Sequence, residues 1–143
     1  MPGPNASERK VRRIALTGGI ATGKSYARGR FEQLGVPTID SDALAHAVIA
    51  ANTPGFAAVV RRFGQSVVSP RGEIDRRKLG GIVFADPAAR RDLEQIVHPE
   101  VQRATDEWFA GLDGATHPFA IADIPLLYEV NREKDFDQVI VTA

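Results

Sequence analysis

Residues 18–25 read GGIATGKS and match the pattern G-x-x-x-x-G-K-[ST] at every fixed position. The apolar run before them predicts a buried strand over 11–16, and a helical spacing of apolar residues begins at Ser25. Between a strand and a helix, such glycines let the backbone fold around an anion with its N–H groups pointing inward. The alternative, a glycine-rich turn with an exposed lysine, is disfavoured by the complete motif in its expected setting.

This loop predicts a site for the phosphates of a nucleoside triphosphate. Gly18, Gly19 and Gly23 supply backbone freedom, Lys24 is placed to reach the outer phosphates, and the hydroxyl of Ser25 is placed to ligate Mg²⁺. The loop alone does not distinguish a kinase from a GTPase, an ATPase motor or a regulatory nucleotide-binding protein. No guanine-reading segment of the type N-K-x-D follows it, which speaks against a GTPase.

Strand patterns alternate with helical patterns along the chain. Strands are predicted over 11–16, 36–39, 119–124 and 138–142. Helices are expected from Ser25 to Gly35, from Asp40 or Ser41 through Ile49, from Pro54 to Gly64, and from Pro87 to Trp108 with a bend or break at His98–Pro99. Because helices separate the strands, we expect an α/β fold of three layers, with a parallel sheet covered by helices on both faces.

Composition narrows the possible partners. The 143 residues include 18 Lys and Arg against 18 Asp and Glu, so the chain offers no strong field for nucleic acid or an anionic membrane. There is no cysteine, which excludes disulfides and a thiol nucleophile, and no apolar stretch predicts a signal or spanning segment. We therefore expect one cytoplasmic domain, with residues 1–10 as a disordered N-terminal segment.

Two aspartates follow the second predicted strand. Asp40 and Asp42 come at its carboxyl end, the edge of a parallel sheet where the phosphate loop also lies. A kinase needs an anion near the transferred phosphoryl group to orient a hydroxyl or accept its proton, whereas an aspartate in this place also commonly caps a helix. Asp123, after the third strand, has the position of an acid that contacts Mg²⁺ directly or through water, or of an ordinary turn residue.

Several longer segments carry a family resemblance. They run from Ile14 to Glu129 and read IALTGGIATGKS, IDSDALAHAVI, FG, GEIDRRKLGGIVFADPAARRDLEQIVHPEV and IADIPLLYE. Their order resembles that of the dephospho-CoA kinases, which use ATP to phosphorylate the ribose 3′-hydroxyl of dephospho-CoA in the last step of coenzyme A synthesis. The HP after a Leu-Glu helix and the DIPLL after the third strand are more specific than the phosphate loop alone.

The resemblance implies a P-loop kinase domain over 11–143, with a helical insertion at about 43–112 that binds dephospho-CoA. It implies that Asp42 activates the ribose hydroxyl and that Asp40 supports the same site. Substrate contacts are implied for Arg76, His98 and Leu126, whose alternatives are a solvated charge, a capping or packing residue, and a core residue. The implied ATP-binding segment consists of Ala21, Thr22, Gly23, Lys24, Ser25 and Tyr26.

Two departures from the family pattern bear on activity. Ala21 and Tyr26 stand where relatives usually have glycine and threonine. Members of the family also continue past the fourth strand into an arginine-bearing lid and a last strand, so we expect a C-terminally truncated kinase with weak or no activity. Another nucleoside or nucleotide kinase, and a non-catalytic ATP-binding fragment, stay open as alternatives.

Overall fold

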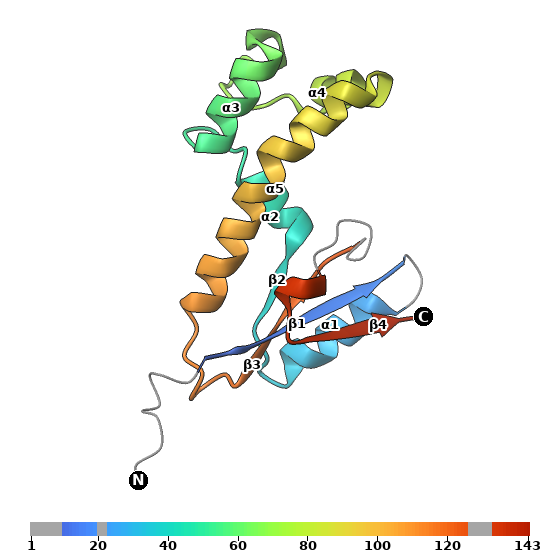
Figure 1. Cartoon of the computed structure of the whole chain (residues 1–143), viewed down its shortest axis with the longest axis vertical. Coiled ribbons are helices and arrows are strands. Elements are labelled where there is room, and N and C mark those ends of the chain that lie inside the picture. The colour runs from blue at the N-terminus through green and yellow to red at the C-terminus, as the bar shows by residue number, and fades with distance from the viewer. Residues whose placement is uncertain (1–9, 20–22, 126–132) are drawn as a thin grey trace. The chain divides into compact units, whose positions relative to one another are not determined.

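The computed structural model describes residues 10–19, 23–125 and 133–143, and the chain divides into two compact units (Figure 1). The sheet unit comprises residues 1–42 and 105–143, and the helical unit comprises residues 43–104. The helices are α1 (Lys24–Gln33), α2 (Ser41–Ala47), α3 (Pro54–Phe63), α4 (Arg76–Ala85) and α5 (Pro87–Ala110), with short 3₁₀ turns η2 (Gln65–Val67) and η3 (Glu133–Asp135).

Four parallel strands form the sheet unit. β1 pairs with both β3 and β4, and β2 pairs with β3, which gives the order β2-β3-β1-β4. The strands are β1 (Arg12–Gly18), β2 (Thr38–Asp40), β3 (Phe119–Asp123) and β4 (Gln138–Thr142). The predicted strands and their parallel pairing are confirmed, and β1 extends beyond its predicted end into the phosphate-loop motif.

Both faces of the sheet are covered by helices. Successive side chains of β1 point to opposite faces, so its residues pack in two different clusters. Ile14 and Leu16 are buried on one face, in a cluster that includes Phe31 of α1. Ala15 lies in a separate cluster with Phe109 from the C-terminal part of α5. A parallel sheet between two helical layers is the α/β fold expected from the sequence.

The helical unit has its own core. Its fully or nearly buried members are Ile49, Val59, Val67 and Leu79. Helix α3 begins as predicted, with the hydroxyl of Thr53 accepting a hydrogen bond from the backbone N–H of Phe56 and with Pro54 as the first helical residue. It ends at Gly64, whose φ of 87° lies in the left-handed region that glycine adopts without strain.

Helix α5 decides between two alternatives, because the sequence predicted a bend or a break at His98–Pro99 and the helix is not broken there. The helix continues for 24 residues with Pro99 inside it. A proline in this position removes one backbone hydrogen bond, yet Ile96 and Val97 pack against the helical unit's core and Val101 is buried. In the described ranges, no helix is both long and apolar enough to cross a membrane.

Candidate active site

Helix α1 begins where the phosphate-loop motif ends. Its N-cap, Gly23, has φ 87° and ψ 11°, a left-handed conformation that strains other residues. No side chain of the described residues caps the first turn of α1, and that turn has no acidic residue. The first N–H groups of α1 and the positive end of its dipole are therefore available to an anion.

Lys24, the first residue of α1, forms an ion pair with Asp123, the last residue of β3. Lys24 Nζ lies 2.8 Å from Asp123 Oδ1, and only 9% of the Asp123 side chain is exposed. The angles of this contact fall outside those of a hydrogen bond, so the buried Oδ1 accepts none from the described residues. Lys24 thus has a carboxylate partner that a phosphate group can replace.

The two neighbouring aspartates have different environments. Asp40 Oδ1 accepts a hydrogen bond of 2.8 Å from the backbone N–H of Asp42, so Asp40 caps α2 as the helix-capping interpretation predicted. The side chain of Asp42 lines the pocket described below, and within the described residues its carboxylate has no hydrogen-bond or ion-pair partner. Asp42 is therefore the better placed of the two to bind a substrate hydroxyl.

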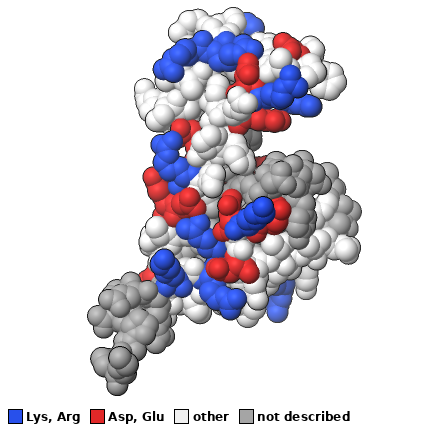
Figure 2. Space-filling model, viewed as in Figure 1, with Lys and Arg blue, Asp and Glu red and all other residues white. Residues whose placement is uncertain are grey.

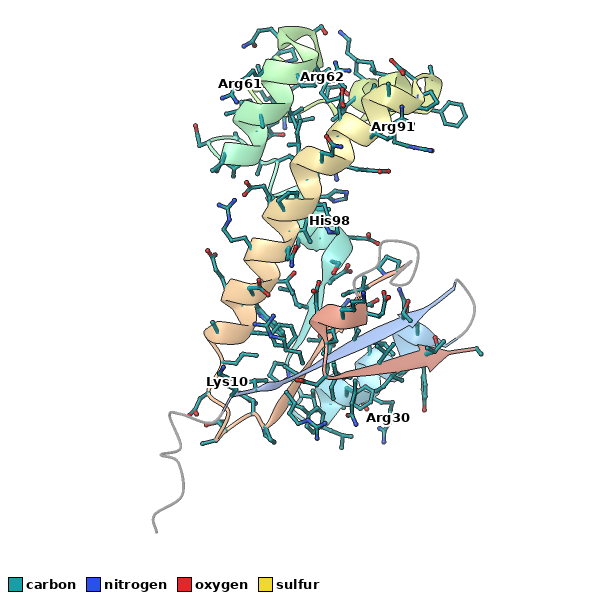
Figure 3. The ribbon with its side chains drawn as sticks, in the orientation of Figure 1. Lys10, Arg30, Arg61, Arg62, Arg91 and His98 are labelled. Carbon is teal, nitrogen blue, oxygen red and sulfur yellow. The ribbon has the colours of Figure 1, made fainter. Side chains whose placement is uncertain are left out.

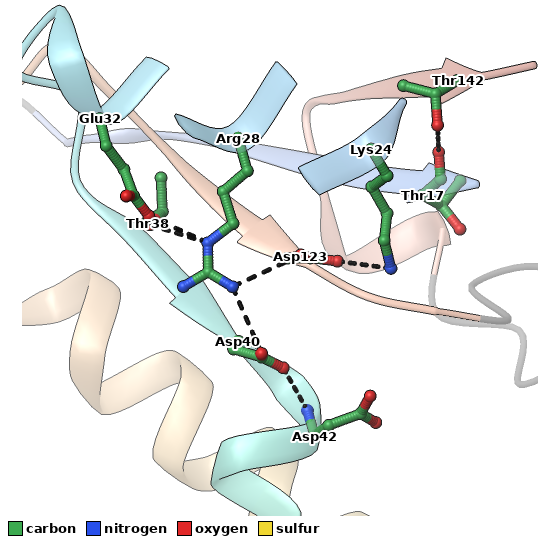
Figure 4. A network of polar contacts seen from close by, with 9 residues as sticks. All are labelled: Thr17, Lys24, Arg28, Glu32, Thr38, Asp40, Asp42, Asp123 and Thr142. Carbon is green, nitrogen blue, oxygen red and sulfur yellow. Dashed lines mark hydrogen bonds and ion pairs between the residues drawn. The ribbon is translucent and has the colours of Figure 1, made fainter. Parts of the chain in front are cut away.

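Arg28 connects the carboxylates of neighbouring strands (Figure 4). Its Nη1 lies 3.3 Å from Asp40 Oδ2 and 3.5 Å from Asp123 Oδ2, and its Nε donates a hydrogen bond of 3.0 Å to Glu32. Burial lowers the pKa of Arg28, but the hydrogen bond to Glu32 and the charges of Asp123, Glu32 and Asp40 outweigh it and leave that pKa raised. Hydrogen bonds from Thr38 and Arg28 lower the pKa of Glu32.

These side chains line one pocket of the sheet unit, with a volume of about 420 Å³. The lining residues are Lys24, Ser25, Arg28, Gly29, Glu32, Asp40, Asp42 and Asp123. On the face of the molecule shown in Figure 2, basic and acidic side chains are interspersed. The pocket instead has an excess of acidic groups, with two cations and four carboxylates. Such a set suits a polyphosphate bound together with a divalent cation.

The pocket unites residues that are far apart in the sequence. The predicted site residues that line it are Lys24, Ser25, Asp40, Asp42 and Asp123. Gly18 is the last residue of β1 and Gly19 follows it, and Tyr26 lies on α1 with 75% of its surface exposed. Ala21, Thr22 and Leu126 lie outside the described residues.

Two predicted substrate contacts belong to the helical unit. Arg76 is the first residue of α4, next to the N-cap Asp75, and His98 lies within α5 (Figure 3). Both side chains are exposed, and neither lines the pocket of the sheet unit. The roles given to them by the family resemblance stay predictions.

Sequence reasoning missed Arg28 and Glu32. A signal was available, because Arg28 and Glu32 follow Lys24 at steps of four residues and the predicted helix begins directly after Lys24. Residues at i, i+4 and i+8 share one face of a helix, so a lysine in the phosphate loop places the other two on the same side. The structure brings all three to the pocket.

The sequence is similar to those of known proteins. The family model described as dephospho-CoA kinase matches residues 12–143. A dephospho-CoA kinase of Anaeromyxobacter dehalogenans is 50% identical over 131 residues, covering 92% of this chain and 62% of that protein. One from Symbiobacterium thermophilum is 43% identical, covering 92% of this chain and 55% of the relative.

Two solved structures are similar in fold. A dephospho-CoA kinase from Campylobacter jejuni superposes with a TM-score of 0.74 at 29% identity, covering 90% of this chain and 64% of its own. A Thermus thermophilus crystal structure superposes with a TM-score of 0.78 at 32% identity, covering 94% of this chain and 66% of its own. This chain therefore spans less than two thirds of the length of the first curated relatives it matches.

Proposed function

The chain belongs to the dephospho-CoA kinase family, and on that premise we propose that it takes part in transfer of the γ-phosphoryl group of ATP to the ribose 3′-hydroxyl of dephospho-CoA. Kinases of this family use ATP. We propose in addition that dephospho-CoA is the substrate of this chain and that the chain acts in the cytoplasm. One observation carries it: a single pocket holds the start of α1, with Lys24 and Ser25, together with the carboxylate of Asp42, which has no partner among the described residues. A phosphate-binding end and an acceptor-orienting acid are the two parts that such a transfer needs.

Mg²⁺ fits the oxygen ligands of this pocket. The hydroxyl of Ser25 and the carboxylate of Asp123 both line it, and Asp123 Oδ1 accepts no hydrogen bond from the described residues. No cluster of three or more ligating His, Cys, Asp or Glu side chains occurs in the described ranges. That is compatible with Mg²⁺, which is usually held by one or two protein oxygens together with substrate phosphates and water. When bound, the ion neutralises charge on the phosphate oxygens.

The proposed role of the phosphate-loop residues is electrostatic. Lys24 exchanges Asp123 for the outer phosphates of the nucleotide, and the open N–H groups at the start of α1 bind phosphate oxygens. We extend the ATP contacts to Gly18, Gly19, Ala21, Thr22, Gly23 and Tyr26, which the family pattern assigns to the same loop. These contacts hold the phosphoryl group in line with the acceptor.

The proposed role of Asp42 is to orient the acceptor hydroxyl and take its proton. Asp40 supports this role by fixing the backbone N–H of Asp42. Arg76, His98 and Leu126 are our candidates for contacts to the rest of dephospho-CoA.

The test is ADP formation from MgATP with dephospho-CoA as the acceptor. The chain should form ADP slowly and in a dephospho-CoA-dependent manner, in line with the weak activity expected above, and Lys24→Ala should reduce the rate to background because phosphate binding is lost. Adenosine as the acceptor is the control for specificity, since a general nucleoside kinase accepts it. ADP formation that does not respond to dephospho-CoA contradicts the proposal, and ATP binding without transfer leaves only a nucleotide-binding function.

Asp42→Asn separates the acid's role from phosphate binding. Because the amide keeps the size of the side chain but cannot take up the proton, turnover should fall by about 10²- to 10⁴-fold. The affinity for ATP, measured by calorimetry, should stay within about twofold, since Asp42 lies apart from the phosphate-binding groups in the proposed mechanism. Unchanged turnover would remove Asp42 from the catalytic role.

A further inference from the structure

We propose that Arg28 is a positioning residue, which holds the carboxylates of Asp40 and Asp123 side by side and through Asp40 fixes the start of α2 that carries Asp42. Neither the loop motif nor the family pattern assigned Arg28 a role. The proposal deepens the proposed function and rests on it for its catalytic consequence. Its structural consequence can be measured without substrate.

Two like charges meet at the ends of β2 and β3. Asp40 and Asp123 are register partners on these neighbouring parallel strands, so their side chains are on the same face of the sheet. Like charges in such a pair repel and destabilise it. Arg28 Nη1 lies within 3.5 Å of an oxygen from each carboxylate and offsets this repulsion with one shared cation.

Lys24 does not replace Arg28 in this arrangement. Among the described residues its ammonium group pairs with Asp123 only, through Oδ1, and in the proposed mechanism it moves to the phosphates. Arg28 contacts the other oxygen, Oδ2, and also reaches Asp40. When Lys24 turns to a phosphate, Arg28 remains as the cation between the two aspartates.

Arg28 is itself held in place from its other side. Its Nε donates to Glu32 one helical turn further along α1, and the hydroxyl of Thr38 donates to the same oxygen of Glu32 (Figure 4). The guanidinium is therefore fixed between an acid of its own helix and the two strand ends. An arginine anchored in this way loses little further conformational freedom when it holds two carboxylates.

The link from Arg28 to Asp42 passes through Asp40. One oxygen of Asp40 accepts from Arg28 at 3.3 Å, and the other accepts from the backbone N–H of Asp42 at 2.8 Å. Because both of its oxygens accept hydrogen bonds, Asp40 links Arg28 of α1 to the first turn of α2. Loss of Arg28 removes the cation that holds Oδ2 of Asp40, and it should loosen the hydrogen bond that Oδ1 accepts from the Asp42 amide.

The experiment compares Arg28→Ala and Arg28→Lys with the matched control Arg30→Ala. Arg30 lies on the same helix (Figure 3), is exposed, and its guanidinium bonds only to Gln33 among the described residues. The first readout is hydrogen exchange of the Asp42 amide by NMR, with the Ile124 amide, which donates to Leu16, as the internal reference. Arg28→Ala should speed exchange at Asp42 by about tenfold relative to Ile124, whereas Arg30→Ala should change neither. General destabilisation would speed exchange at both amides.

The second readout is turnover. Arg28→Ala should lower kcat by about 10- to 100-fold with little change in the KM for ATP, because a misplaced acid affects the transfer step. Arg28→Lys should restore part of kcat, since a lysine is a point charge that can serve one carboxylate at a time.

Unchanged exchange at Asp42 in Arg28→Ala overturns the proposal, whatever the activity. A loss of ADP affinity as large as that of Lys24→Ala also overturns it, because Arg28 would then be a phosphate ligand. A parent chain without dephospho-CoA-dependent turnover contradicts the proposed function alone, and the exchange readout still decides the role of Arg28.

Discussion

Helices α1 and α3 have the same length of ten residues but differ in how they are stabilised. The N-terminus of α3 is closed by the side chain of Thr53, and its Val59 is completely buried. The N-cap of α1 is Gly23, which offers no side chain, and no residue of α1 is buried. The face of α1 at positions 24, 28 and 32 instead lines the pocket.

If the proposed function is correct, the contrast reflects a loss of helix stability at α1 that leaves room for a phosphate-binding site. A capping side chain at α1 would occupy the N–H groups that the proposed mechanism assigns to phosphate. Apolar residues in place of Lys24 and Arg28 would remove the cations that contact Asp123. No residue of α3 lines this pocket, and its ends and its buried face follow the rules of helix stability.

The largest effect that we expect in this comparison is stabilisation by ADP. ADP with Mg²⁺ at 100 times its dissociation constant should raise the free energy of unfolding by about 2.7 kcal/mol, because it binds only the folded chain. At the same ADP concentration Lys24→Ala should lose most of this gain, and Arg61→Ala, in the last turn of α3, should keep it. Urea unfolding with and without ADP measures both. Equal gains in the two variants would show that ADP does not bind at the start of α1.

The next effect concerns the buried face of α3. Val59 is 0% exposed and packs in the cluster with Leu79, so Val59→Ala should lower the free energy of unfolding by about 2 kcal/mol through lost burial and a small cavity. The control is Leu34→Ala, at the C-terminal cap of α1, where the side chain is 71% exposed and little burial is lost. If urea unfolding shows the same loss of unfolding free energy for Val59→Ala and Leu34→Ala, side-chain burial does not account for the difference in stabilisation between α1 and α3.

A smaller effect is expected at the cap of α3. Thr53 Oγ1 accepts from the N–H of Phe56 at 3.0 Å, so Thr53→Ala should cost about 1 kcal/mol of unfolding free energy. Thr53→Ser keeps the hydroxyl and should retain most of that stability. A thermal or urea melt of both variants measures the difference. An alanine variant as stable as the serine one would mean that the cap contributes nothing.

The sequence predicted those parts of the fold whose signals are local. The apolar runs predicted all four strands, and Thr53, Pro54 and Gly64 predicted the limits of α3. The loop motif and the aspartates at strand ends predicted residues that do share a pocket, because parallel strands end at one edge. Their chemical roles stay predictions.

Tertiary packing explains what the sequence did not predict. Helix α4 contains Gly80 and Gly81, which weaken any helical signal, yet capping by Asp75 and burial of Leu79 stabilise it. Pro99 predicted a bend or a break in α5, and the helix continues without a break, with apolar contacts on both sides of the proline. Arg28 carries no motif, and its importance comes from two carboxylates that lie 12 and 95 residues away.

The smallest effect is expected at Glu32, an exposed residue of α1 that accepts hydrogen bonds from Arg28 and Thr38. Hydrogen bonds from Thr38 and Arg28 lower the pKa of Glu32 from its ordinary value of 4.5. A carboxyl whose pKa is lower in the folded state stabilises the fold above the unfolded value, and that contribution is lost as the pH falls through the folded value. The urea midpoint of the parent chain should therefore exceed that of Glu32→Gln at pH 7, and the gap should close below about pH 4.5. Thr38→Val removes one of the two hydrogen bonds and should show a part of the same pH dependence. A gap that is constant with pH would mean that Glu32 stabilises α1 by packing, and that its charge contributes nothing to holding Arg28.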